Sequence, residues 1–139
     1  MVERSFTKDK RVTFTIPESA DALIQIYDYG HLITHGDQVS GGGGIGGIYP
    51  PIMRMRARKH ARYMVTGKSF QTLWLGHWHQ YISTPSMVVN GSLKGYDEYA
   101  MLMGFGHEPP QQALAIVTPE RNITIQAPVF CMDRKKEGW

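Results

Sequence analysis

A short apolar run, Leu-Trp-Leu at residues 73–75, ends in a glycine and two histidines, His77 and His79. Side chains two positions apart on a β-strand lie on the same face, so both imidazoles are expected to point the same way where the strand ends. Ligand sites in α/β proteins form at that edge of a sheet, and imidazole is a common ligand of Zn, Mn, Fe and Ni. The pattern H-x-H alone is equally typical of two surface histidines, so both interpretations stay open.

A second stretch also consists of a short apolar run that ends in a histidine and a glycine. The apolar residues 32–33 lead through Thr34 to His35, which is followed by Gly36 and Asp37. If the two strands are neighbours in one sheet, their ends bring three imidazoles together. Asp37 is then a candidate oxygen donor beside them.

These two stretches, followed by Asn90-Gly91-Ser92, resemble the C-terminal half of the calcineurin-like metallophosphoesterases. That family has metal-binding blocks in the order D-x-H, G-D, G-N-H-[DE], a lone histidine before glycine, and G-H-x-H. His35 matches the lone histidine, and His77 and His79 match the last block. The resemblance runs from about residue 25 to residue 92. The glycine-rich residues 40–47 and residues 91–98 are similar to phage-encoded members.

The resemblance implies a metal-dependent phosphoesterase. His35 and His77 would hold one divalent ion and His79 a second, with Mn expected first and Zn, Fe or Ni as alternatives. The turn at Asn90 would support the metal site from below. The implied fold is an α/β mixed sheet with one main helix, which forms half of a four-layer α/β/β/α sandwich.

None of the first three family blocks precedes His35 in this chain. In the family they supply the carboxylate that bridges two metals and the histidine thought to protonate the leaving group. The chain is therefore expected to be a fragment of a longer protein, one half of a split enzyme, or a degenerate member that binds without hydrolysis. A partner chain or a second copy would supply the missing half in the split enzyme.

The bulk composition fits one globular domain. The chain has 139 residues, of which 42% are hydrophobic and 19% charged, with a formal net charge of +3 that slightly favours an acidic partner. A single cysteine excludes an internal disulfide. The polar first ten residues and the lack of an apolar run of about 18 residues predict a cytoplasmic protein without a membrane span.

Periodicity and turn residues predict the remaining elements. A helix is expected to begin at Pro50-Pro51 and to end at Gly67. His31, at the far end of its strand from His35, is expected on the surface. The expected strands are residues 11–16, 23–27, 31–35, 70–75, 81–83 and 87–89, then a short helix through residue 103 and a hairpin of residues 112–117 and 122–130 that finishes the sheet.

The predicted helix carries two rows of side chains at helical spacing. The row expected to face the core is Met53, Ala57, Ala61 and Met64. The other row is Arg54, Arg58 and Arg62. The arginines are interpreted as a solvated face or as a basic stripe that follows a phosphodiester backbone. Under the second interpretation they bind substrate together with Asp37, and nucleic acid is the favoured phosphodiester. The competing hypothesis is a non-catalytic nucleic-acid-binding or assembly module.

Two further stretches bear on the site. The glycine-rich residues 40–47 are interpreted as a flexible connection or as a flap whose backbone N–H groups face phosphate oxygens. Trp78, between the two histidines, is expected to pack against the protein rather than to stack on a substrate.

Overall fold

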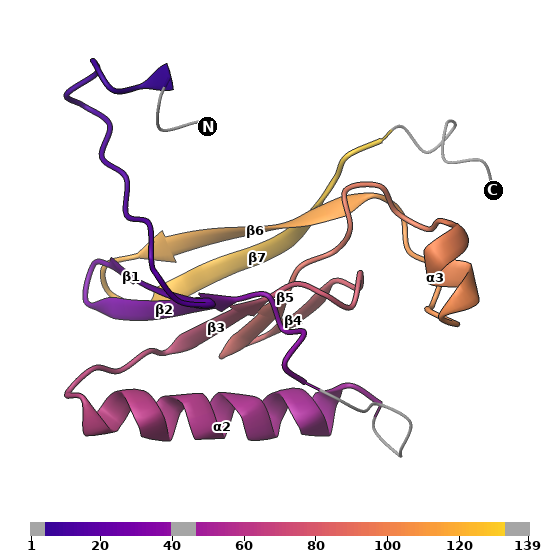
Figure 1. Ribbon diagram of the computed structural model, residues 1–139, viewed down its shortest axis with the longest axis horizontal. Helices are drawn as coiled ribbons and strands as arrows, with labels where there is room; N and C mark the ends of the chain where they lie inside the picture. Colours follow the sequence, from indigo (N-terminus) through magenta and orange to yellow (C-terminus); the bar gives the residue numbers. More distant parts are fainter. Residues whose placement is uncertain (1–4, 40–46, 133–139) are drawn as a thin grey trace.

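A computed structural model describes residues 5–39 and 47–132. A five-stranded sheet carries the long helix α2 on one face, and a two-stranded hairpin lies across the other face (Figure 1). The sheet strands are β1 (Asp21–Ile26), β2 (Tyr29–Thr34), β3 (Thr72–Leu75), β4 (Ile82–Thr84) and β5 (Met87–Val89). The other elements are α2 (Tyr49–Val65), α3 (Glu98–Leu102), β6 (Gln111–Thr118) and β7 (Asn122–Phe130).

The sheet has the strand order β1-β2-β3-β5-β4. Its centre is parallel, because β3 pairs in parallel with both β2 and β5, whereas β1 and β4 join antiparallel at the edges. Thr34 and Leu75 are opposite each other in the register, so β2 and β3 end at the same edge. The predicted mixed α/β sheet with one main helix is confirmed.

The long helix follows its predicted limits but buries a different face. Two prolines occupy its first turn, and Gly67 beyond its end has a φ of 70°, as expected for a glycine that terminates a helix. The row containing Met53 and Met64 is exposed, and the prediction that it faces the core is wrong. The residues that α2 buries are Ile52, Met55 and Lys59.

An ion pair between α2 and β1 explains why the helix buries this face and not the predicted one. The Lys59 Nζ atom lies 2.6 Å from Asp21 Oδ1, and both side chains are nearly buried. The methylene stem of a lysine packs as an apolar chain, so a buried carboxylate partner makes it a core residue. Sequence periodicity counts lysine as polar and therefore leaves Lys59 outside the apolar row.

Three other expectations are wrong. Residues 11–16 form no strand. The hairpin β6–β7 is a separate two-stranded sheet and does not extend the first one. His31 is fully buried, and its Nδ1 accepts a hydrogen bond of 3.1 Å from the Trp74 Nε1–H group. The last result follows from the hairpin: Thr72, opposite His31 in the register, accepts a hydrogen bond from the Asn122 side chain of β7.

Within the described residues, no helix has the length and apolar character that a membrane crossing requires. Residues 40–46 of the predicted glycine-rich connection lie outside the described part of the chain.

Candidate functional site

His35 and His77 meet at the edge where β2 and β3 end. Their ring centroids are 5.3 Å apart and the rings are nearly perpendicular, at 78°. The Gly76 N–H group donates a hydrogen bond of 3.0 Å to the His35 carbonyl oxygen, which ties the two chain segments together just beyond the strands. The parallel pairing of β2 and β3 thus places two imidazoles side by side.

His79 lies in different surroundings. β3 ends at Leu75, and the φ angles of His77 and His79 are 73° and 55°, so strand alternation does not apply to these residues. The His79 ring packs against Phe105 and Tyr99, with centroid distances of 5.9 and 6.2 Å. The expectation that His77 and His79 share one strand face is therefore wrong. Trp78 between them is buried in the core, as predicted.

The donors present fit part of a metal centre. The described residues contain no group of three or more His, Cys, Asp or Glu side chains placed to hold a metal ion. His35 and His77 provide two imidazoles, and Asp37 is exposed nearby in sequence. The Nδ1 atom of His79 is buried and has no hydrogen-bond partner, which is costly for a polar atom. Two imidazoles suit a divalent ion of intermediate softness, such as Zn²⁺, but they leave its coordination incomplete.

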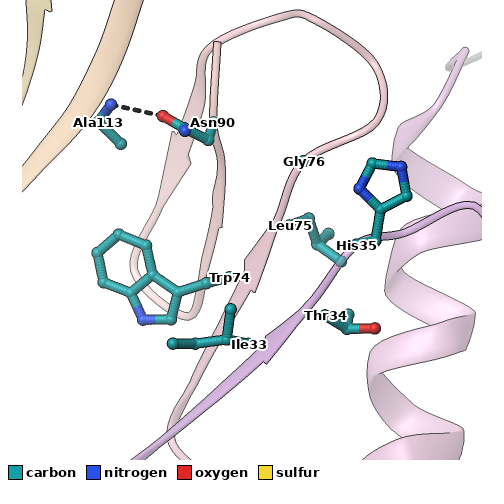
Figure 2. Close-up of a pocket in the computed structure, with 8 residues that line it drawn as sticks. All are labelled: Ile33, Thr34, His35, Trp74, Leu75, Gly76, Asn90 and Ala113. Carbon is teal, nitrogen blue, oxygen red and sulfur yellow. Dashed lines mark hydrogen bonds between the residues drawn. The ribbon is translucent and has the colours of Figure 1, made fainter. Parts of the chain in front are cut away.

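A cavity of about 400 Å³ opens between the sheet and the hairpin, beside the strand ends. Figure 2 shows Trp74 and Ile33 on the side of the strands that faces Ala113 and Asn90, whereas the His35 ring lies beyond the strand ends. Asn90 accepts a hydrogen bond of 2.7 Å from the Ala113 N–H group. Its amide also donates to the Gln112 side chain, so Asn90 connects the end of β5 to β6.

A second cavity of about 440 Å³ has His77 among the residues that line it. His77 and Gln80 line it from the loop after β3, and Tyr99 and Phe105 line it from α3 and the loop that follows. Sequence reasoning missed both aromatic residues. The available pattern was one ring on a short helix and a second ring six positions later, between two glycines, and this pattern alone does not point to a cavity.

The arginine row lies on the solvent side of α2. Arg54, Arg58 and Arg62 are exposed. Arg56, two positions from both Arg54 and Arg58, faces the sheet instead and donates a hydrogen bond of 3.0 Å to the Gln71 carbonyl oxygen. No contact of these three arginines in the described residues tests whether they bind substrate, so that role stays a prediction.

Comparison with known proteins identifies a fold. No family model and no curated protein matches this sequence. The structure is similar to wild-type Vps29 from Entamoeba histolytica in its Zn²⁺ complex, with 14% identity, a TM-score of 0.50, and coverage of 81% of this chain and 61% of that one. A single mutant of the same Vps29 gives 15% identity, a TM-score of 0.48, and coverage of 86% and 66%.

The fold that this similarity defines is metallophosphoesterase-like. The predicted mixed α/β fold class is therefore confirmed, whereas the assignment to the C-terminal half of a metallophosphoesterase stays a prediction. It spans 61% of the length of the Zn²⁺-bound Vps29 chain.

Proposed function

We propose that this chain provides part of a metal-dependent phosphoesterase site, in which His35 and His77 bind a divalent ion. The observation that carries the proposal is the 5.3 Å approach of these two rings at the converging ends of β2 and β3. The structural similarity to a Vps29 determined with Zn²⁺ supports a divalent ion in this fold. Mn remains the ion that the sequence motifs favour, with Zn, Fe and Ni as alternatives.

The two imidazoles would bind through neutral ring nitrogens, and the bound ion would supply Lewis-acid polarisation of a phosphoryl oxygen. The Gly76 hydrogen bond to His35 holds both ligand-bearing segments in place. His79 is proposed to serve a second ion, which would satisfy its unpartnered Nδ1 atom. The carboxylate ligands would come from a partner chain, a second copy or a further part of the same protein.

The proposed substrate is a phosphodiester, with nucleic acid as the favoured class. Arg54, Arg58 and Arg62 are spaced four residues apart, a pattern that disfavours the helix by roughly 0.2–0.5 kcal/mol per pair. Their exposure keeps them accessible to a phosphate backbone. The exposed arginine row also favours the second candidate function, a nucleic-acid-binding or assembly module without catalysis. Asp37 would contact substrate or metal in the first case only.

Metal content tests the first function directly. The purified chain is incubated with Mn²⁺ or Zn²⁺, desalted and analysed by mass spectrometry, together with His35→Ala, His77→Ala and His79→Ala. We expect near-stoichiometric metal in the wild type and its loss in His35→Ala and His77→Ala. His107→Ala is the matched control, because His107 is an exposed loop residue. Equal metal content in the wild type and in the His35 and His77 variants would refute the proposed site.

Nucleic-acid binding separates the two functions. Arg58→Glu is expected to weaken binding of a short DNA duplex about tenfold or more at low salt, because it replaces a phosphate contact with a repulsive charge. Under the second function His77→Ala leaves that binding unchanged, and the wild type holds no metal. Under the first function the wild type binds metal. When the chain is combined with the part that supplies the missing carboxylate ligands, removing the metal with a chelator lowers phosphoesterase activity.

A further inference from the structure

The cavity beside His77 has the lining of an aromatic-ring site. Its volume of about 440 Å³ lies within the range of small-ligand pockets. The Tyr99 and Phe105 rings line it and meet edge to face, with centroids 6.0 Å apart and an interplanar angle of 80°. Gln80 adds an amide that can donate and accept hydrogen bonds. Apolar ring surfaces beside the polar side chains of Gln80 and His77 suit a flat ring that has a hydrogen-bonding edge.

Local contacts hold these walls in place. Asp97 caps the start of α3 by accepting from the Ala100 N–H group at 2.9 Å, and the Phe105 N–H group donates to the Ala100 carbonyl oxygen at 2.9 Å. Glu108 accepts from the Tyr81 N–H group at 2.8 Å, which joins the loop after α3 to the segment that follows His79. The His79 ring supports both aromatic walls from the other side.

The position of the cavity connects it to the histidine pair. His77 is shared, because its ring meets His35 and the residue also lines the cavity. A phosphoryl group near His35 and His77 would therefore have its organic substituent next to Tyr99 and Phe105. We infer that this cavity binds the aromatic ring of an aromatic phosphoester, either a nucleobase or a simple aryl group. This inference rests on the proposed function for the position of the phosphate, but not for the ring site itself.

Binding calorimetry on the full chain tests the inference. The probes are 5′-AMP, phenyl phosphate, adenosine and inorganic phosphate, each with and without Mn²⁺. We expect both aromatic phosphoesters to bind more tightly than inorganic phosphate, and adenosine to bind without Mn²⁺. A stronger affinity for 5′-AMP than for phenyl phosphate would identify a nucleobase as the ring, and the reverse would identify an aryl group.

Variants locate the binding. Tyr99→Ala and Phe105→Ala are each expected to weaken adenosine and 5′-AMP binding about five- to fiftyfold, as for loss of one stacking partner. Tyr99 is half exposed, so its truncation leaves the core intact. Leu102→Ala is the matched control, because Leu102 lies on the same helix and its side chain is exposed. Circular dichroism confirms that each variant is folded.

The outcomes distinguish the two proposals. Adenosine binding that Tyr99→Ala weakens, without any Mn²⁺ or phosphate binding, supports the ring site and refutes the metal site. Metal-dependent phosphate binding with no preference for aromatic esters refutes the ring site alone. Folded Tyr99 and Phe105 variants that bind adenosine as tightly as the wild type would also overturn the inference.

Discussion

The two faces of the five-stranded sheet are packed very differently. On the α2 face, Leu32, Leu73 and Val89 have no exposed surface. On the hairpin face, Ile33 is 42% exposed, and the cavity of about 400 Å³ remains between the two sheets. A seventeen-residue helix supplies large side chains to one face, whereas a two-stranded hairpin covers the other incompletely.

The side chains of the hairpin explain the difference. Ala113 lines the cavity, and Gln126 reaches the sheet through hydrogen bonds with Ser83 and the Thr84 carbonyl oxygen. Most large apolar residues of the hairpin are exposed, namely Leu114, Ile116, Ile125, Val129 and Phe130, whereas Val117 and Ile123 are half-buried. Small and polar side chains therefore make up much of the surface that the hairpin turns toward the sheet, so this face relies on hydrogen bonds more than the α2 face does.

The largest predicted effect tests the polar contact within the well-packed face. Lys59→Met leaves the Asp21 carboxylate nearly buried without its partner, and we expect a loss of about 3 kcal/mol in the free energy of unfolding. Urea denaturation measures this loss. The double variant Lys59→Met, Asp21→Leu is expected to recover most of it, because an apolar pair of similar volume removes the unpaired charge. A loss below about 0.5 kcal/mol in the single variant would mean that solvent screens the pair.

The same ion pair marks a limit of sequence-based prediction. The α/β class, the limits of α2 and the approach of His35 to His77 follow from hydrophobic runs, prolines and glycines, which act locally or through strand pairing. The buried face of α2 depends on Asp21, which is 38 positions away. Periodicity within the helix contains no information about such a partner, so it selected the row of Met53 instead.

Backbone conformation set a second limit. His79 leaves the face of His77 because both residues adopt positive φ, which is uncommon outside glycine and has no clear sequence pattern. Residues 11–16 have strand-like alternation but no neighbouring edge to pair with in the structure, and a strand needs a partner as well as a pattern.

On the hairpin face, we predict that low pH lowers the free energy of unfolding by a smaller amount. Burial lowers the pKa of His31, whose Nδ1 accepts from Trp74 and whose Nε2 has no partner. Below about pH 6.5 the unfolded chain binds a proton at this histidine that the folded chain does not, so the free energy of unfolding falls as the pH falls. The expected slope from this group is at most about 1.4 kcal/mol per pH unit.

Urea denaturation at pH 7.5 and pH 5.5 measures this effect. His31→Phe removes the titrating group and is expected to reduce the dependence on pH, whereas His107→Ala on the surface is expected to leave it unchanged. A His31→Phe variant that loses as much stability in acid as the wild type would assign the effect to other groups.

The last predicted effect has opposite signs on the two faces. Ala113→Val adds two methyl groups beside the cavity of about 400 Å³, and β-branched residues favour strands, so we expect a gain of about 0.5–1 kcal/mol. Val89→Ile adds one methylene group to the fully buried core on the α2 face, where we expect a loss of about 1–3 kcal/mol from overpacking. Thermal unfolding of the two variants measures the contrast. If both substitutions destabilise the protein equally, the hairpin face is packed as closely as the helix face, and the difference between the faces is only apparent.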